Sequence, residues 1–339
     1  MVAMHPASAK IFAMRTAAGT GLVLLGLLNG LLFAAPVLAE GAPTEPRVVA
    51  SPAPVERLDL AAVGWRSLAY SRSNIWTSVS SRIVLHEVSG EALQPGPRPS
   101  VDAAAGPLLL LQAENQAASN LERVSSWFDP TADTLVQRCR VAYGSNDRRA
   151  QCYWYEGQTV WRERRESGEA GAPEASNWLE ASPGAVQVPD WRVSSRIELS
   201  RPATMPAAAG LVSPMMLFPL ASVAPLERPG DSHDVFVHTD RDFFRVTLRL
   251  RGRETTDVEY QATAADGAVR KVVGPVRALV VAVEPRAEGK ARDEFTLLGM
   301  SGPLSLLLDP ETRVPLAVRG RAPWVGETEL QLQSVALSQ

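Results

Sequence analysis

The chain has little of the chemistry that marks enzymes or nucleic-acid-binding proteins. Its 339 residues include only two cysteines and four histidines, and the formal net charge is −3. A balance so close to neutral gives no electrostatic reason to expect nucleic acid as a partner. The sequence also has no G-x-S-x-G nucleophile motif and no glycine-rich phosphate loop. We therefore predict a protein that is not an enzyme and binds no cofactor.

Long apolar runs are scarce too, and the one that stands out lies near the N-terminus. Residues 17–35 are mostly apolar, follow two basic residues and lead into Val37-Leu38-Ala39. A basic region, an apolar core and small residues at the −3 and −1 positions are typical of a secretory signal peptide. We expect a signal peptide over residues 1–39, cleavage after Ala39 and a periplasmic location. An uncleaved anchor is the alternative, because about 19 apolar residues just span a bilayer.

The rest of the chain divides into two parts. Residues 40–57 are rich in proline, which is typical of a disordered linker. Residues 58–339 are expected to form the folded domain. A subdivision of that domain near Pro183 stays open, although no internal repeat demands it.

Short apolar runs separated by turn residues dominate the folded domain. Near the C-terminus, glycine, proline and aspartate separate four such runs, which are Phe295–Leu298, Leu304–Leu308, Val314–Val318 and Leu330–Val335. Runs of this length and spacing are typical of a meandering antiparallel sheet. With the runs upstream, the pattern predicts roughly ten to thirteen strands.

The clearest strand is Phe243–Arg251, in which apolar and polar residues alternate. Its apolar face is expected to pack against the core, and its polar face is expected to be exposed to solvent. Thr255–Thr263 is predicted as the next strand. Further strands are expected at Asn74–Val88, Leu108–Ala113, Leu121–Phe128, Val186–Leu199 and Val276–Val283. The charged and then glycine-rich residues 163–183 are expected to form a loop.

The most informative hairpin is Thr134–Trp161. Its two strands flank Gly144-Ser145-Asn146-Asp147, a cluster of turn-forming residues. A turn centred between Ser145 and Asn146 places Cys139 directly opposite Cys152, close enough to bridge if the pair is of the non-hydrogen-bonded type. An oxidising compartment permits that bond, so we predict a structural disulfide. Two free core thiols are the alternative, and the lack of a C-x-x-C motif argues against a redox-active pair.

Three blocks of turn and strand residues carry a family resemblance. They are Trp127-Phe128-Asp129-Pro130, then Arg245-Val246-Thr247-Leu248 with Thr256–Tyr260, and Asp309-Pro310-Glu311-Thr312-Arg313-Val314-Pro315-Leu316 with Gly320 and Val325-Gly326. On these blocks, residues 65–337 resemble an uncharacterised family of bacterial envelope proteins similar to the lipoprotein-carrier (LolA-like) half-barrels. The resemblance implies an all-β fold with minor α structure: a strongly curved antiparallel sheet, or half-barrel, closed by one or two short helices. It carries no catalytic residues, and related half-barrels hold acyl chains or lipoproteins.

The segment Pro202–Pro229 supplies the candidate ligand-binding residues. Its prolines prevent a single long helix, so we predict short helices at Ala207–Leu211 and Pro214–Leu220. Methionines adapt to irregular apolar shapes, and ligand sites are concave and mostly apolar. The candidate lid over an apolar ligand consists of Met205, Met215, Met216, Leu217, Phe218 and Leu220. A plain core helix is the alternative.

Two further residue sets have a structural and a functional interpretation. Six tryptophans in or beside strands are expected to fill the core of the curved sheet, although some could line a cavity; they are Trp76, Trp127, Trp154, Trp161, Trp191 and Trp324. One polar stretch has the side-chain types of a zinc or calcium site: His233, Asp234, His238, Asp240 and Asp242. Alternate residues of a strand lie ~7 Å apart, so ligands from elsewhere would be needed. We interpret the stretch as a solvated strand and loop, and predict no metal.

Two functions fit these observations. The first is an exported periplasmic binding or carrier protein that holds an acyl chain, a lipid or a lipoprotein tail between the sheet and the methionine-rich lid. The alternative is a non-enzymatic structural or assembly protein of the envelope that binds another protein, for which an exposed sheet edge offers a route.

Overall fold

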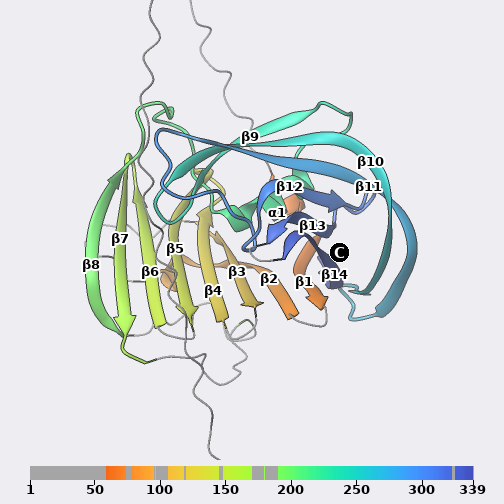
Figure 1. Ribbon diagram of the computed structural model, residues 1–339, viewed down its shortest axis with the longest axis horizontal. Helices are drawn as coiled ribbons and strands as arrows, with labels where there is room; N and C mark the ends of the chain where they lie inside the picture. The colour runs from red at the N-terminus through yellow and green to blue at the C-terminus, as the bar shows by residue number, and fades with distance from the viewer. Residues whose placement is uncertain are drawn as a thin grey trace, which may run out of the picture. The chain divides into compact units, whose positions relative to one another are not determined.

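Consecutive strands lie side by side in one strongly curved sheet (Figure 1). The computed structural model describes residues 59–73, 78–94, 96, 106–117, 120–144, 148–169, 179, 190–322 and 325–338. Within these residues the sheet has 14 strands in the order β8-β7-β6-β5-β4-β3-β2-β1-β14-β13-β12-β11-β10-β9. The predicted mostly antiparallel, curved sheet with minor α structure is confirmed. The predicted signal peptide and linker lie outside the described residues.

The strands are β1 (Trp65–Ser73), β2 (Ser78–Val88), β3 (Leu108–Ala117), β4 (Asn120–Asp129), β5 (Thr134–Tyr143), β6 (Arg148–Glu156), β7 (Thr159–Ser167), β8 (Arg192–Ser200), β9 (Ser232–His238), β10 (Phe243–Thr263), β11 (Val269–Ala287), β12 (Ser301–Leu308), β13 (Pro315–Ala322) and β14 (Gly326–Leu337). The helical elements are η1 (Leu60–Ala62), η2 (Gly90–Ala92), η4 (Pro214–Met216) and α1 (Leu217–Val223). No helix in the described part of the chain is long and apolar enough to cross a membrane.

Two meanders make up the sheet. Strands β1–β8 form one, β9–β14 form the other, and antiparallel pairing of β1 with β14 joins them. The far end of β10 also pairs in parallel with β14, where Gln261 lies beside Ser334. Strands β10–β14 therefore close into a ring, whereas the first meander stays open and ends at β8.

Strands β10 and β11 form a long hairpin of 21 and 19 residues that arches over the shorter strands of the ring, β12–β14 (Figure 1). The predicted strands Phe243–Arg251 and Thr255–Thr263 are therefore one continuous strand. The register with β11 skips one residue between Leu250 and Gly252. This bulge bends the strand rather than ending it, because β11 supplies hydrogen-bonding partners along the whole length.

The predicted β5–β6 register is confirmed. Cys139 lies opposite Cys152 with a Cα–Cα distance of 4.1 Å, and a disulfide joins the two residues. The expected loop over residues 163–183 is wrong at its beginning, because β7 continues to Ser167. There Glu163 accepts hydrogen bonds from Arg165 and Arg196, each at 2.7 Å. These ion pairs stabilise an extended segment whose charged composition is more typical of a loop.

Two other local predictions are wrong. Residues 207–211 are not helical; instead the Leu211 carbonyl accepts a hydrogen bond from the Leu135 amide at 2.7 Å. Phe295–Leu298 is not a strand, because Leu298 adopts a φ of 52° and turns the chain back, which leaves only an isolated bridge between Leu297 and Met300. Leu211, Phe295 and Leu297 are buried in these segments although none of them belongs to a helix or strand.

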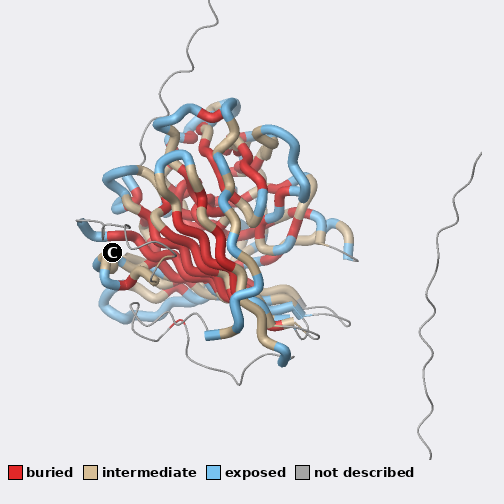
Figure 2. The backbone as a smooth tube through the Cα atoms, turned by 90° about the vertical axis from the view of Figure 1, so that its left-hand side faces the viewer, coloured by how far each residue is buried: buried red, intermediate tan, exposed pale blue. Residues whose placement is uncertain are grey.

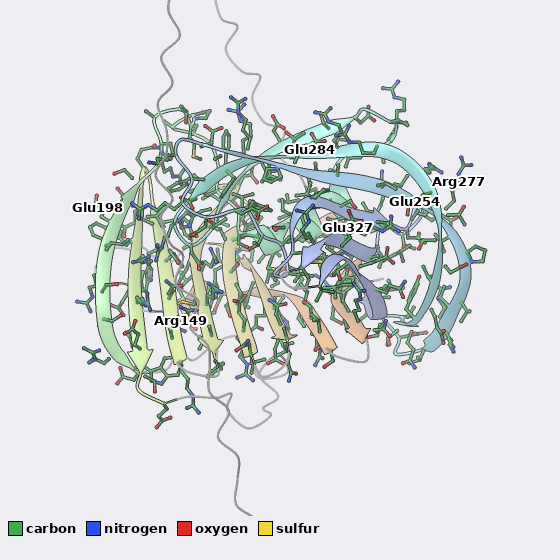
Figure 3. All side chains as sticks on the ribbon, viewed as in Figure 1. Arg149, Glu198, Glu254, Arg277, Glu284 and Glu327 are labelled. Atoms are coloured by element: carbon green, nitrogen blue, oxygen red, sulfur yellow. A yellow bond between two sulfur atoms is a disulfide. The ribbon has the colours of Figure 1, made fainter. Side chains whose placement is uncertain are left out.

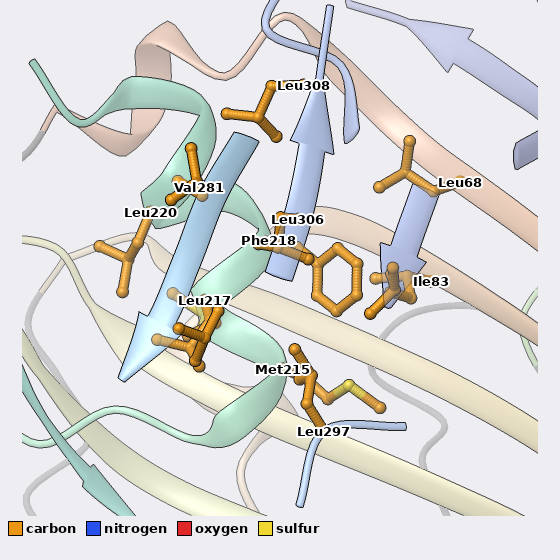
Figure 4. Close-up of a cluster of buried hydrophobic side chains, with 14 of the residues drawn as sticks. Leu68, Ile83, Met215, Leu217, Phe218, Leu220, Val281, Leu297, Leu306 and Leu308 are labelled. Atoms are coloured by element: carbon orange, nitrogen blue, oxygen red, sulfur yellow. The ribbon is translucent and has the colours of Figure 1, made fainter. Parts of the chain in front are cut away.

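The short helix predicted at Pro214–Leu220 is present as η4 followed by α1, with Pro214 at its first position. This helix lies against one face of the curved sheet, which we call the inner face. Phe218 is fully buried there, and its ring centroid is 5.9 Å from that of Tyr70. Figure 4 shows Phe218 between Ile83 and Leu306. The buried parts of the chain gather where the strands run side by side (Figure 2).

The opposite, outer face carries a second apolar cluster over β3–β6. Trp127 and Trp154 are buried in it beside the disulfide. Trp127 points outward because its neighbour Ser126 points inward and donates a hydrogen bond to Ser213, just before η4. These two tryptophans therefore pack on the outer face instead of filling the inside of the curve. Trp76 and Trp324 lie outside the described residues.

Candidate binding site

A hollow of about 310 Å³ lies on the inner face, at the first turn of the buried helix. Its walls come from β3–β5, from η4, from the turn between β9 and β10, and from the segment that precedes β12. The lining residues are Asn115, Glu122, Val124, Arg138, Arg140, Ser213, Pro214, Met215, Thr239, Asp240, Asp293, Glu294, Thr296, Leu298 and Gly299.

One wall of the hollow is apolar. Val124 projects from β4, Pro214 and Met215 form the first turn of η4, and Leu298 comes from the turn before β12. Met215 is only 6% exposed, and Figure 4 shows it beside Leu297. An apolar wall of this kind favours a ligand with an apolar part, because burial removes that part from water.

The other wall carries a network of charged side chains. Arg138 and Arg140 project inward from β5 because both alternate with the outward-facing Cys139. Arg138 Nη2 lies 2.8 Å from Asp240 Oδ1, and Arg140 pairs with both Asp240 and Glu122. Burial alone would raise the pKa of Asp240, but the charges of the two arginines outweigh it and lower that pKa to about 2. The network therefore stays ionised at any physiological pH.

Arg138 also fixes the turn between β9 and β10 against β5. Its Nη1 donates hydrogen bonds to the carbonyl oxygens of Thr239 at 3.0 Å and His238 at 3.3 Å. The Tyr153 hydroxyl donates to the Asp240 carbonyl at 3.1 Å, and the Arg138 guanidinium lies 5.2 Å from the Tyr153 ring centroid. Hydrogen bonds from a buried guanidinium are stronger than neutral ones, so this wall is rigid.

The segment that forms the rim is positioned by a buried carboxylate. Asp242 accepts hydrogen bonds from the backbone amides of Arg292 and Asp293, each at 3.0 Å. Asp293 and Glu294 are themselves exposed at the rim. The hollow therefore has a neutralised charge network inside, in which Arg138 is buried and its partners are partly exposed, and two carboxylates at its entrance.

Of the predicted lid residues, only Met215 lines this hollow. Met216, Leu217, Phe218 and Leu220 belong to the main core, each 3% exposed or less. Met205 lies in a different cluster, with Tyr153, Phe236 and Phe243. The structure thus brings the residues of η4 and α1 together but separates Met205 from them.

The residues considered for a metal site have other partners. Asp234 accepts a hydrogen bond from the Thr247 hydroxyl at 2.5 Å, Asp240 is paired with arginines, and Asp242 holds the rim. The His238 ring is fully buried. Among the residues that the structure describes, no group of three or more histidine, cysteine or acidic side chains could hold a metal ion.

Two other hollows are less suited to an amphipathic ligand. One, of about 760 Å³, is lined almost entirely by polar side chains of β1 and β12–β14, among them Arg72, Arg319 and Glu327. The other, of about 250 Å³, lies on the outer face beside the disulfide and includes Glu163 and Trp154. Ligand sites combine an apolar lining with a few placed polar groups, and the hollow at η4 meets that description best.

Sequence reasoning missed the charged wall of this site. The sequence showed only that Arg138 and Arg140 lie on the sheet face opposite to Cys139, because residues alternate along a strand. Their partner Asp240 lies about a hundred positions away in the chain, in the turn between β9 and β10, and no periodicity links that turn to β5. No pattern in the sequence predicted that Asp293 and Glu294 would lie at the rim of a site.

The fold and the hollow together define a curved-sheet protein with an internal helix and a small site of mixed polarity. No protein family model, curated protein or solved structure matches the chain. The resemblance to LolA-like carriers therefore stays a prediction.

Proposed function

We propose that this chain is a non-enzymatic envelope protein that binds one end of an amphipathic lipid or lipoprotein tail in the hollow at η4. The observation that carries the proposal is the mixed lining: Met215, Pro214 and Leu298 on one side, and the Arg138–Asp240 pair on the other. An acyl chain lies against the apolar wall, and the polar group next to it contacts the charged wall.

The volume limits what the hollow holds. About 310 Å³ is at the lower end of the range for ligand pockets, roughly 300–1,000 Å³. A longer chain would need α1 to move aside. Exposing Met216, Leu217, Phe218 and Leu220 costs about 2 kcal/mol each. A total near 8 kcal/mol rivals the whole stability of a typical domain. We therefore propose that η4 is a fixed wall of the site, that α1 stays packed in the core behind it, and that the ligand enters beside η4.

Native mass spectrometry of protein purified from envelope membranes tests the proposal. We expect a bound species of lipid mass that disappears after organic extraction. A bare polypeptide mass at every stage of gentle purification would contradict lipid binding and favour the alternative of an assembly protein.

Leu298→Asp is the variant that tests the position of the site. Leu298 lines the hollow, is only half-buried and has a φ of 52°, a conformation that aspartate adopts more readily than leucine. The variant should fold and lose most of the bound lipid. Val273→Asp is the matched control, because Val273 is 64% exposed on β11. Equal lipid occupancy in both folded variants would rule out this hollow. Charged substitutions at Met216 or Phe218 are unsuitable, since both side chains are fully buried.

A further inference from the structure

One border of the curved sheet is formed by β8, whose outer edge has no partner strand among the described residues. β8 is the last strand of the first meander, and within the described residues it pairs only with β7. Its even-numbered residues are exposed, and Ile197 and Leu199 on its inner face are half-buried. In Figure 3, Glu198 lies at this border of the sheet. An edge strand presents unpaired N–H and C=O groups that can pair with another strand.

The register shows which groups point away from β7. The Arg201 amide donates to the Gln158 carbonyl at 2.9 Å, so positions 201 and 158 form a hydrogen-bonded pair. Hydrogen-bonded pairs alternate along an antiparallel ladder. The pairs Glu163↔Arg196 and Trp161↔Glu198 are therefore of the non-hydrogen-bonded type. Hence the backbone groups of residues 196, 198 and 200 point to the free edge.

The disulfide gives an independent check of this assignment. Cys139 and Cys152 have a Cα–Cα distance of 4.1 Å, which is typical of a non-hydrogen-bonded pair. A residue inside a sheet directs its backbone groups to one neighbour only. The backbone groups of Cys152 therefore pair with those of Glu163 on β7. The backbone groups of Glu163 then point toward β6, so they form no hydrogen bond with the backbone of Arg196 on β8. Both routes place the Arg196 backbone groups at the edge.

A second copy of β8 fits this edge in one register. Antiparallel pairing about a two-fold axis at Ile197 sets Arg196 opposite Glu198 of the other copy, twice. These are the residues whose backbone groups are free, so the two pairs form about four main-chain hydrogen bonds. If one β8 strand shifts by two residues along the other, the hydrogen-bonding pattern is kept. Depending on the direction of the shift, Arg196 then lies opposite Arg196, or Glu198 opposite Glu198. Like charges directly opposite one another are destabilising, so charge selects the first register.

Both charged side chains are available for such contacts. The Arg196 side chain is 63% exposed, although it pairs with Glu163, which Arg165 also neutralises. Glu198 is exposed and has no ion pair within the described part of the chain. On the inner face, the same register brings the two Ile197 side chains together. We propose that two copies of this protein associate through antiparallel pairing of their β8 strands, which continues the sheet from one molecule into the next.

Sedimentation equilibrium of the purified protein tests this proposal. The contact is small, so we expect a reversible dimer that is populated by about 100 µM. Glu198→Arg turns two attractive pairs into two repulsive ones and should weaken association by roughly tenfold or more. Glu311→Arg, an equal charge change in the turn between β12 and β13, should leave association unchanged.

Mixing gives the most specific readout. Arg196→Glu and Glu198→Arg each repel themselves but attract each other in the proposed register, so an equimolar mixture should form heterodimers. If Arg196→Glu does not fold, Glu198→Pro serves instead, because proline there removes a free-edge donor without disturbing the β7 ladder. A wild-type monomer at all concentrations up to about 100 µM would overturn the proposal. A dimer unaffected by Glu198→Arg and Glu198→Pro would do the same.

Discussion

The fully buried His238 makes the stability of this protein depend on pH. Its ring packs edge-on against Tyr153 and Tyr155, with centroid distances of 5.3 and 5.6 Å, and its Nδ1 lies 3.0 Å from the Tyr155 hydroxyl. Burial, reinforced by the nearby charge of Arg138, lowers the pKa of His238 to about 3. Asp240 acts in the opposite direction but does not compensate. The folded protein therefore keeps this histidine neutral in weak acid.

The sign of the effect follows from the unfolded state. An exposed histidine has a pKa of about 6.5. Below that pH, His238 binds a proton in the unfolded chain but stays neutral in the folded protein. Stability attributable to His238 is present above pH 6.5 and is lost as the pH falls toward 3. Between pH 7.5 and 4.5 the loss amounts to roughly 3 kcal/mol, at about 1.4 kcal/mol for each pH unit below 6.5. Asp240 adds little in this window, because its carboxyl is mostly ionised down to pH 4.5 in both states: its ordinary pKa is 3.8 and its pKa in the folded protein is about 2.

Urea unfolding at pH 7.5 and 4.5, followed by tryptophan fluorescence, measures this loss. His238→Phe keeps an aromatic ring beside Tyr153 and Phe243 but removes the titrating group. The variant loses the hydrogen bond with Tyr155 at both pH values, so that cost cancels in the comparison. We expect the variant to lose roughly 3 kcal/mol less than the wild type between the two pH values. The same change at the half-buried His86 should have a smaller effect. Identical pH dependence of the wild type and His238→Phe would refute the reasoning.

Two further predictions concern stability. Replacing both Cys139 and Cys152 with serine should lower the free energy of unfolding by ~3 kcal/mol, because the bridge closes a loop of about a dozen residues; equal urea midpoints for this variant and the wild type would contradict it. Gly210→Ala should cost roughly 2 kcal/mol or more, since a Cβ there would lie 1.8 Å from the Asp133 carbonyl oxygen. Gly230→Ala is its control, although Gly230 has a positive φ of 99°, and thermal unfolding of both variants should show a larger fall in midpoint for Gly210→Ala.

The parts of the fold that the sequence predicts correctly are those where local signals suffice. The disulfide follows from a turn cluster between two strands, because the centre of a short turn sets the register of both. The start of the buried helix follows from Pro214, whose ring suits the first helical turn. These features depend on residues that are close in sequence, so no knowledge of the rest of the fold is needed.

The errors occur where distant partners decide the conformation. β7 extends to Ser167 because Glu163 meets Arg196 of the next strand, a contact that no local pattern encodes. The apolar run Phe295–Leu298 resembles a strand in composition, yet among the described residues its backbone has one isolated bridge and no ladder partner. The charged wall of the hollow is a similar case, since it depends on Arg138 meeting Asp240 across the curve.

The position of the hollow follows from a change of character along the inner face. On β3 the inward-facing side chains include Leu109 and Leu111, which pack in the core that surrounds α1. Two strands further, on β5, the same alternation presents Arg138 and Arg140. The apolar helix packs with the first set of side chains, whereas the arginines pair with Asp240 of the turn between β9 and β10, because burying an arginine without an ionic partner is too costly. A site of mixed polarity therefore forms where the apolar side chains of the inner face meet the charged ones.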